Sequence, residues 1–343
     1  MYKYNLHMNK KYVLVFLCSF GFAVSCFGQS KNSQTNYEFH YEDIRNFKKV
    51  YEVAKSKGDT LKAMEDYFAN ASEGMKAWLD RYNRTPKLMT TLLNYMPNYY
   101  AYLSNIEDEL VKYEGAISKG LDGLKKIYPS KYVHIPPIYY FILFGGGGSA
   151  EMTANMISVD YFANYDELDT SEFKKVGGVF PEGKWALVSL EMIPQIAVHE
   201  VVHLFQSYMQ GEEDYVSIYL DKGKTSMQAY AIREGGADFL AFLGSGYKID
   251  ERHIYGDANE EELWRQFKEI LDANPDDNPG WFSGKSKINP DWPWQIGYYM
   301  GFKIVEYYYN QSDDKKMAIK LILNSHENED FEKFIKSYSK KWK

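Results

Sequence analysis

The sequence predicts an α+β fold that is mainly helical, with a small sheet ahead of a central helix. Two portions of the chain, residues 41–128 and the part after Pro194, repeat apolar and aromatic residues at spacings of three and four, as helices do. Between these portions, residues 132–144 are rich in β-branched and aromatic residues, which favour strands. We therefore expect helices packed around a short strand-rich region.

Residues 29–130 are expected to form an N-terminal helical region. Breaks near Gly58, Pro86 and Pro97 divide its apolar periodicity and predict three to five helices. No Ser- or Pro-rich linker follows this region. It should therefore pack against the rest of the chain, residues 131–343, instead of standing alone.

The predicted sheet begins with residues 132–144. Short apolar runs at 156–159 and 185–190 predict further strands, and residues 170–183 between them predict a loop. The four glycines at 145–148 lack the Gly-Lys-Ser/Thr ending of a phosphate-binding loop, so a turn at the end of a strand is favoured there.

The helical period returns after Pro194. Helices are expected at 196–209, 226–243 and 295–310, and two shorter ones behind them. Residues 274–292 are rich in Pro, Gly and Asp, which predicts a long irregular loop over one face of the domain.

Residues 1–28 have the pattern of an export signal. Lysines come first, and an apolar run at 12–27 follows that is shorter than the roughly 20 residues a membrane span needs. Two processing routes fit the residues: cleavage after Gly28, or lipidation of Cys26 in a lipobox-like segment. We expect an exported protein that is periplasmic, secreted or lipid-anchored in the cell envelope.

The two cysteines of the chain, Cys18 and Cys26, both lie inside this predicted signal. Cleavage after Gly28 would leave the mature chain without cysteine, which excludes a disulfide framework and a thiolate zinc site. Any metal in the mature protein would then be held by histidines and carboxylates.

The chain is acidic, with 40 Lys and Arg against 47 Asp and Glu. Loss of residues 1–28, which contain three Lys and no acid, would move the formal charge from −7 to −10. Proteins that bind nucleic acid need clustered basic residues, so the charge argues against a nucleic-acid partner. Beyond the signal no stretch is long and apolar enough to span a membrane, so we expect no transmembrane helix in the mature chain.

The strongest chemical signal is His-Glu-Val-Val-His at residues 199–203, within an apolar predicted helix. His199 and His203 are four residues apart, so one helix face would present both imidazoles to a single ion. Glu200 would lie about 100° around the helix, where it can take a proton from a water held by that ion. The alternative interpretation is two satisfied core histidines and a surface glutamate, but burying such groups uncompensated is costly.

A tetrahedral zinc ion with one open position needs a third protein ligand. Glu234 offers one on a second predicted helix, and Asp238 follows one helical turn later. Asp238 could accept the free N–H of a ligating histidine and so fix its tautomer. The glycines between them, Gly235 and Gly236, would let this helix approach the motif helix closely. The alternative is that Glu234 is a solvated surface carboxylate.

This arrangement resembles the gluzincin metallopeptidases, in which His-Glu-x-x-His and a Glu on a following helix hold zinc. The resemblance implies a zincin-like catalytic core with one Zn²⁺. Position by position, His199, His203 and Glu234 would be the ligands and Glu200 the general base. An Asp four residues beyond the third ligand supports a histidine in that family, which implies the same role for Asp238.

The chain is also similar to a bacterial family of predicted zinc-dependent proteases, classed as a domain of unknown function. That similarity rests on the motif helix, on Glu-Gly-Gly-Ala-Asp at 234–238, and on Gly-Tyr-Tyr-Met-Gly at 297–301. A more distant resemblance is to a lipoprotein associated with gliding motility. The alternative function is therefore a non-catalytic, metal-containing binding lipoprotein of the cell envelope or surface.

Gluzincins use a Tyr or a His to donate a hydrogen bond to the oxyanion of the tetrahedral intermediate. The candidates for this role are Tyr298, Tyr299 and His253. The two tyrosines are preferred because they begin a predicted helix after the long loop and have glycines beside them. The alternative for each is ordinary packing.

In the same family an edge strand ahead of the motif helix pairs with an extended peptide substrate. Residues 156–159 or 185–190 are the expected source of such a strand. The sequence thus predicts an exported zinc metallopeptidase whose partner is a peptide or protein substrate. A zinc hydrolase acting on a non-peptide amide would share the same metal site.

Overall fold

The computed structural model describes most of the chain after the predicted signal peptide, which itself lies outside the described residues together with both cysteines. Thr35–Lys343 form one compact unit. The loop 211–225 after the motif helix and most of 164–186 are also outside the description. The described residues are 36–128, 134–163, 168, 171–173, 187–210, 226–248, 250–283, 286, 288–325 and 328–342.

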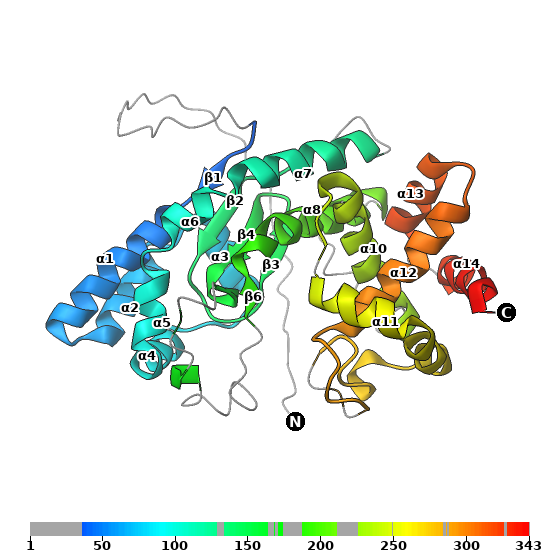
Figure 1. Cartoon of the computed structure of the whole chain (residues 1–343). Coiled ribbons are helices and arrows are strands. Elements are labelled where there is room, and N and C mark those ends of the chain that lie inside the picture. The colour runs from blue at the N-terminus through cyan, green and yellow to red at the C-terminus, as the bar shows by residue number, and fades with distance from the viewer. Residues whose placement is uncertain are drawn as a thin grey trace, which may run out of the picture. The chain divides into compact units, whose positions relative to one another are not determined.

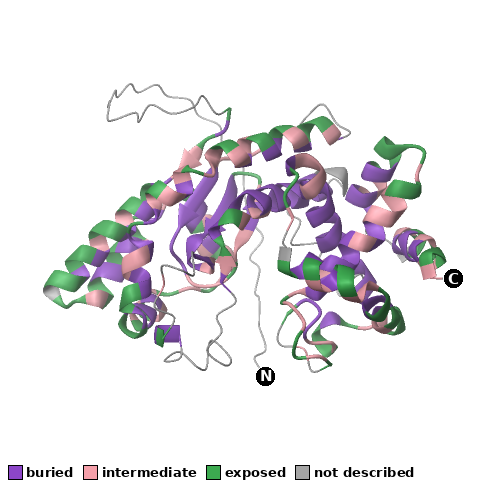
Figure 2. Ribbon diagram, viewed as in Figure 1, coloured by how far each residue is buried: buried purple, intermediate pink, exposed green. Residues whose placement is uncertain are grey.

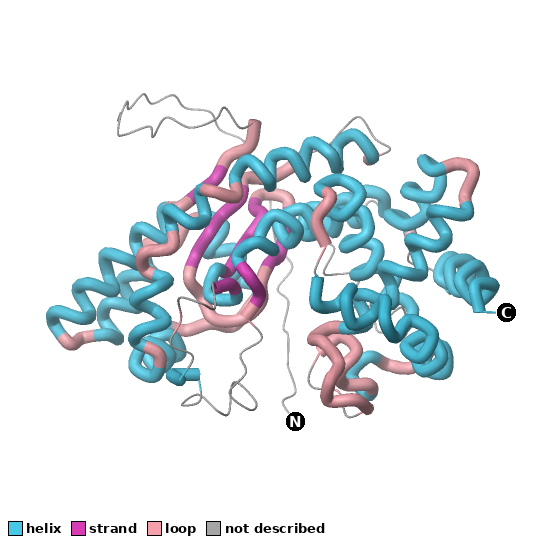
Figure 3. Tube along the Cα trace, in the orientation of Figure 1, coloured by secondary structure: helices cyan, strands magenta, loops and turns pink. Residues whose placement is uncertain are grey.

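The predicted α+β class is confirmed: the described residues are mainly helical and include a small mixed sheet (Figure 3). The N-terminal region is divided more finely than the three to five helices expected. Gly58, Pro86 and Pro97 each mark a helix boundary as predicted. Its helices are α1 (Glu42–Lys57), α2 (Thr60–Ala69), α3 (Glu73–Arg81), α4 (Pro86–Tyr95), α5 (Pro97–Leu103), α6 (Glu107–Val111) and α7 (Glu114–Ile127).

One of the additional boundaries shows why the helix count was too low. Ser72 caps α3, and its side chain accepts a hydrogen bond from the backbone N–H of Met75 at 3.1 Å. A serine cap of this kind satisfies an otherwise unpaired N–H at a helix start. It ends one helix and begins another without the glycine or proline on which the sequence prediction relied.

The main sheet has the strand order β1-β2-β4-β3, in which only the β3–β4 pairing is antiparallel. A separate parallel pair joins β5 to β6. Short 3-10 helices, η1 (Val159–Tyr161) and η5 (Leu190–Met192), follow β4 and β6. The strands are β1 (Phe39–His40), β2 (Ile138–Phe141), β3 (Gly148–Glu151), β4 (Ala154–Ser158), β5 (Phe162–Ala163) and β6 (Val188–Ser189).

One of the two strands proposed for the sheet edge was wrong for that role. The run 156–159 belongs mostly to β4, which is central in the main sheet. The described part of 185–190 contains β6, which belongs to the separate two-stranded sheet, and its proposed role stays a prediction. The edge beside the motif helix is β3, whose first residue is the last glycine of the predicted turn. Gly148 and Ser149 have low strand propensity, so the edge strand escaped the prediction.

The two faces of the main sheet are covered by different helices. On one face, Trp78 of α3 packs against Phe141 of β2 with ring centroids 5.2 Å apart. On the other face, the side chain of Asn155 in β4 donates a hydrogen bond to the carbonyl of Ala197, 2.8 Å away in the motif helix α8 (Ile193–Gln210). Because side chains alternate along a strand, the sheet separates α3 from α8.

The C-terminal helices surround α10 (Figure 1). The predicted helices at 196–209, 226–243 and 295–310 correspond to α8, α10 and α12, and the loop 274–292 contains only one short helical turn among its described residues. Helix α11 was missed, because its sequence is polar and has no continuous apolar stripe. The remaining helices are α10 (Met227–Ser245), α11 (Asp250–Phe267), η7 (Lys268–Ile270), η8 (Pro275–Asp277), α12 (Ile296–Gln311), α13 (Lys315–Asn324), α14 (Asn328–Tyr338) and η9 (Ser339–Trp342).

Glycines set the packing of α10, although not in the way the sequence suggested. A Cβ atom at Gly235 would collide with the backbone of Gly301 in α12, and one at Gly236 would meet Ile322 of α13 at 3.0 Å. Likewise, a Cβ at Gly301 would collide with the backbone of Ala231. The prediction that Gly235 and Gly236 admit the motif helix was therefore wrong: they admit α12 and α13 on other sides of α10.

Helices α8 and α10 are buried along almost their whole length (Figure 2). Polar and charged side chains nevertheless occur on both helices. Because they are buried, they need hydrogen-bond partners or opposite charges within the protein. Among the described residues, no helix is long and apolar enough to cross a membrane.

Candidate metal centre

The two histidines of the motif lie side by side on α8. His199 is 7% exposed and His203 is 1% exposed, so neither is solvated. Their Nε2 atoms are 3.0 Å apart. The spacing of four residues has therefore placed both imidazoles on one helix face, as predicted.

Glu234 completes this group from α10. Its Oε2 atom lies 3.3 Å from Nε2 of His199 and 3.3 Å from Nε2 of His203. The residue is buried, with 5% of its surface exposed, so it is not a solvated surface carboxylate. The donor atoms of His199, His203 and Glu234 all lie within 4.8 Å of one another, and the three residues could hold a metal ion.

The hydrogen bonds behind the histidines determine what this group can bind. Nδ1 of His199 is 2.8 Å from Oδ1 of Asp238, and Nδ1 of His203 is 2.8 Å from Oε1 of Gln206. Both oxygens are acceptors, so each Nδ1 donates and each neutral imidazole turns an Nε2 lone pair toward Glu234. Two lone pairs and a carboxylate that face one another in a buried space could hold a cation between them.

The pKa values agree with a site that attracts positive charge. Burial acts to lower the pKa of His199, but the carboxylates of Asp238, Glu234 and Glu200 together outweigh it and raise the pKa to about 10. Burial acts to raise the pKa of Glu234, but His203 and His199 hold it well below its usual range.

Asp238 is itself held from two further directions. Its Oδ1 accepts a hydrogen bond of 3.0 Å from Nε2 of Gln195, and its Oδ2 lies 3.3 Å from the guanidinium of Arg252. Burial alone would raise the pKa of Asp238, but Arg252 and His199 lower it. Asp238 therefore remains an ionised acceptor for His199, in the position that the sequence assigned to it.

Gln206 was not predicted as part of the site. Its Nε2 donates a hydrogen bond of 3.0 Å to the backbone carbonyl of Arg233 on α10, which leaves its Oε1 turned toward His203. The residue lies one helical turn after His203, so the spacing along the motif helix contained the signal. Its link to α10 depends on the tertiary structure and could not be read from the sequence.

Glu200 lies beside the three-residue group without belonging to it. It is buried, with 8% exposed, and that burial raises the pKa of its carboxyl. A Cβ atom at Gly148 of β3 would come within 2.7 Å of the Glu200 Cγ and 2.8 Å of its Oε1. The side chain of Glu200 therefore occupies the narrow space between α8 and the edge strand.

The two candidate tyrosines point in different directions from α12. Tyr298 faces the metal group, because its ring stacks on that of His199 with centroids 6.2 Å apart and planes 22° from parallel. The guanidinium of Arg252 lies 4.9 Å from the centre of the Tyr298 ring. Tyr298 thus lies beside one of the candidate ligands.

Tyr299, in contrast, is directed away from the metal group. It is 1% exposed, and its hydroxyl donates a hydrogen bond of 3.0 Å to Asp257 of α11. The rings of Tyr299 and Phe302 pack against His253, with centroids 5.4 and 4.6 Å from it. Successive residues differ by about 100° around a helix, and here that rotation turns Tyr299 toward α11 while Tyr298 faces His199. The expectation that Tyr299 belongs to the site was wrong, and so was the His253 alternative.

A second tyrosine near the site was not predicted. Tyr230 lies on α10 one helical turn before Glu234, and the ring of Phe282 packs on those of Tyr230 and Tyr298, with centroids 4.5 and 6.2 Å away. Burial raises the pKa of Tyr230, and the charge of Glu234 adds to the increase.

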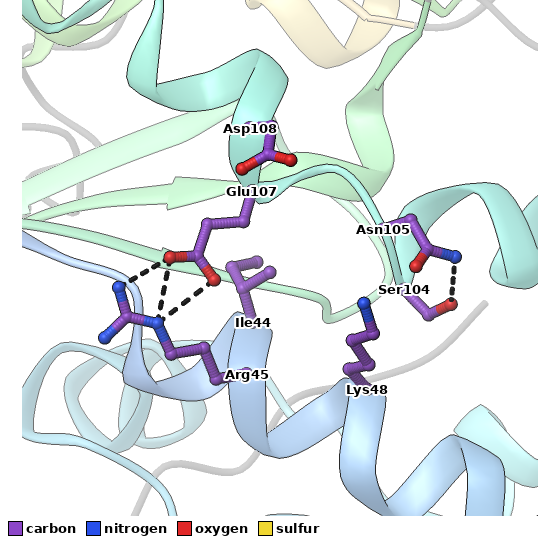
Figure 4. Close-up of a pocket in the computed structure, with 7 residues that line it drawn as sticks. All are labelled: Ile44, Arg45, Lys48, Ser104, Asn105, Glu107 and Asp108. Carbon is purple, nitrogen blue, oxygen red and sulfur yellow. Dashed lines mark hydrogen bonds and ion pairs between the residues drawn. The ribbon is translucent and has the colours of Figure 1, made fainter. Parts of the chain in front are cut away.

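A small pocket elsewhere in the molecule shares no residue with this group. It lies between α1 and the segment from α5 to α6, and the ion pair of Arg45 with Glu107 closes one side of it (Figure 4). The pair is largely exposed, and acidic and basic side chains balance around the pocket. It offers no chemistry comparable to that of the buried histidines.

Comparison of the chain with known proteins gives no match to a family model, to a curated protein or to a solved structure. The functional argument therefore rests on the residues of this chain.

Proposed function

We propose that this protein is an exported zinc-dependent metallopeptidase of the gluzincin type with a zincin-like core. The observation that carries the proposal is the convergence of His199, His203 and Glu234 in a buried space, with the carboxylate of Glu200 beside them. Zinc suits this donor set, because it accepts imidazole nitrogen and carboxylate oxygen in tetrahedral sites. Three protein ligands leave a fourth position open, as catalytic sites require.

Zinc bound here would lower the pKa of a water molecule and polarise a substrate carbonyl. Glu200 would take the proton of the attacking water and return it to the leaving amine. Asp238 and Gln206 would hold the two imidazoles in the orientation that turns each Nε2 inward. Tyr298 would donate a hydrogen bond to the carbonyl oxygen as its negative charge develops.

The edge strand supports a peptide as the substrate. Among the described strands, β3 pairs only with β4, so its other edge carries backbone groups that β4 does not use. One of them, the carbonyl of Ala150, accepts a hydrogen bond of 3.4 Å from Arg81, which a bound peptide would have to displace. An extended peptide can add to such an edge by main-chain hydrogen bonds. Because Gly148 of β3 lies against Glu200, a peptide bound there would bring its backbone close to the proposed general base.

The experiment that tests this proposal compares zinc content and peptide hydrolysis in the mature chain and in the variant Glu200→Gln. We expect about one zinc per chain in both, and a loss of at least about 1,000-fold in kcat for the variant. Glu191→Gln, an exposed position just before α8, is the matched control. A variant that keeps its turnover would refute the role of Glu200.

The competing functions predict other outcomes of the same experiment. A zinc-loaded wild-type chain that cleaves no peptide in a broad library would indicate a metal-containing binding protein of the cell envelope. Hydrolysis of non-peptide amides alone would indicate a different zinc hydrolase. A chain that binds no zinc would remove the basis of the proposal.

A further inference from the structure

Helix α3 ends in an arginine that lies against strand β3. Nη1 of Arg81 donates a hydrogen bond to the hydroxyl of Ser149 and a longer one, of 3.4 Å, to the carbonyl of Ala150. Its Nη2 lies 3.8 Å from Oε2 of Glu151, and only 14% of the arginine side chain is exposed. Arg81 therefore brings a largely buried positive charge to three successive residues of the strand proposed to bind substrate.

The pairing of β3 with β4 decides which backbone groups of β3 face its other edge. Gly147, just before the strand, accepts a hydrogen bond of 3.2 Å from the N–H of Ser158. Backbone groups alternate in direction along a strand, so Ser149 also turns its N–H and C=O toward β4. Gly148 and Ala150 turn theirs to the other edge. These are the two positions at which a peptide could pair with β3.

Side chains alternate as well, and they place two opposite charges on the two faces of β3. A Cβ atom at Gly148 would point at Glu200, on the face covered by α8. The hydroxyl of Ser149 points to Arg81, on the face covered by α3. Residues opposite each other on neighbouring strands share a face. A substrate residue opposite Gly148 would therefore lie beside Glu200, and the next substrate residue, opposite Ser149, would direct its side chain to Arg81.

A peptide bound at this edge would change the surroundings of the guanidinium. It would take over the carbonyl of Ala150 and so remove one acceptor of Arg81, and it would also exclude water from the charge. A buried charge is costly unless an opposite charge compensates it. The carboxylate of Glu151 is 3.8 Å away and also accepts a hydrogen bond of 3.1 Å from Thr153. An acidic side chain of the substrate could bind the guanidinium more closely.

We propose that Arg81 makes the peptidase selective for peptides with Asp or Glu next to the residue held at Gly148. A guanidinium binds a carboxylate through two parallel hydrogen bonds, which gives both strength and orientation. The selectivity rests on the proposed function, because pairing of a peptide with β3 is part of it. The whole chain carries a formal charge of −7, so a preference for acidic peptides has to come from a local cation.

The test compares peptides of one sequence that carry Glu, Gln or Lys at either position next to the cleaved bond. With the zinc-loaded mature chain, kcat/KM should be about 10-fold higher for the Glu peptide than for the Gln peptide. Arg81→Glu should reverse the order and favour the Lys peptide, and Arg81→Lys should keep part of the preference for Glu. Each ratio is measured on one preparation, so a partly unfolded variant does not change it.

Two further variants separate the local charge from general effects. Glu151→Gln removes the competing carboxylate and should raise the ratio of Glu to Gln peptide cleavage. Arg265→Glu is the matched control, because Arg265 is an exposed arginine of α11 that pairs with Glu262. It should leave the ratio at the wild-type value.

Binding of the same peptides to zinc-loaded Glu200→Gln, with and without Arg81→Glu, distinguishes selectivity from catalysis. Fluorescence anisotropy should show the same preference for the Glu peptide, lost when Arg81 is replaced. Equal cleavage ratios in the wild type and in Arg81→Glu would overturn the selectivity and leave the peptidase standing. Binding that prefers Glu through Arg81, without cleavage by the wild type, would retain the selectivity and refute the peptidase. Binding without preference, or no binding, would overturn the selectivity.

Discussion

Oε1 of Gln206 lies 2.8 Å from Nδ1 of His203, while the amide nitrogen of the same side chain is bonded to α10. Gln206 thus orients one candidate ligand and ties the helix of the histidines to the helix of Glu234. Removing it should free the imidazole to turn.

Gln206→Leu should weaken zinc binding by about 10-fold to 100-fold, because groups that orient metal ligands have effects of that size. Competition with a chelator of known affinity would measure the loss. Gln266→Leu on α11 removes an amide that bonds only to a nearby exposed glutamate, and it should have no effect. Equal affinities in the two variants would contradict the role of Gln206.

Asp238→Ala should weaken zinc binding to a similar extent, because His199 would lose the acceptor of its Nδ1 proton. It should also leave Arg252 buried without its counter-ion, so the melting temperature should fall as well. Chelator competition and calorimetry would separate the two effects. Asp313→Ala, at an exposed position, is the control and should change neither.

Gly148→Ala should reduce catalysis without removing the metal. The new methyl group would come within 2.7 Å of the Glu200 side chain, which would have to move. We expect kcat to fall about 10-fold or more, while zinc content stays at the wild-type value. Thr153→Ala, in the exposed turn between β3 and β4, is the comparison. Loss of zinc in Gly148→Ala would show that the strand supports the ligands instead.

Gly235→Ala should destabilise the fold, because its methyl group would collide with the backbone of α12. Forcing extra atoms into a packed interior costs about 1–3 kcal/mol. Gly115→Ala is the matched control: that glycine is also helical, but a Cβ there meets nothing within 4 Å. It should leave stability unchanged or raise it slightly. Denaturant unfolding would compare them, and equal midpoints would exclude tight packing at Gly235.

Asp160 should make stability depend on pH. Burial raises the pKa of its carboxyl to about 8, above the value of about 4 expected in the unfolded chain. Between about pH 4 and pH 8 the folded protein therefore keeps a proton on Asp160 that the unfolded chain has released. The contribution of Asp160 to the free energy of unfolding is complete below about pH 4 and declines by about 1.4 kcal/mol per pH unit until about pH 8. Asp160→Asn should flatten this decline, measured by denaturant unfolding from pH 5 to 9. The same slope in both proteins would contradict it.

A residue of the candidate site could be predicted where its position depends on neighbours in the sequence. It could not be predicted where its position depends on a contact between distant segments. The positions of His199 and His203 follow from helical periodicity alone, and the same spacing placed Asp238 one turn after Glu234. Glu234 itself was chosen because zinc needs a third ligand. Gln206 also lies one helical turn after His203, but its hydrogen bond to the Arg233 carbonyl joins α8 to α10. Such contacts are fixed by packing, which a single sequence does not display.

The incorrect predictions have the same origin. A glycine pair in a helix predicts a close neighbour, but Gly235 and Gly236 could not reveal that the neighbours are α12 and α13. Tyr298 and Tyr299 are alike in type and adjacent in sequence, so only the rotation of α12 distinguishes them. Strand β3 was missed because its residues have low strand propensity, and pairing with β4 stabilises it regardless.

The contact between Gly235 and Gly301 gives two residues without side chains a part in the chemistry. Gly235 follows Glu234 directly, and Gly301 lies on α12 one turn after Tyr298. The close approach of α10 and α12 at these two glycines therefore sets the distance between Glu234 and the ring of Tyr298. Larger residues at either position would increase the separation of α10 and α12 and move Tyr298 away from the imidazole of His199. Redesign of this centre for another substrate would have to keep glycine at both positions.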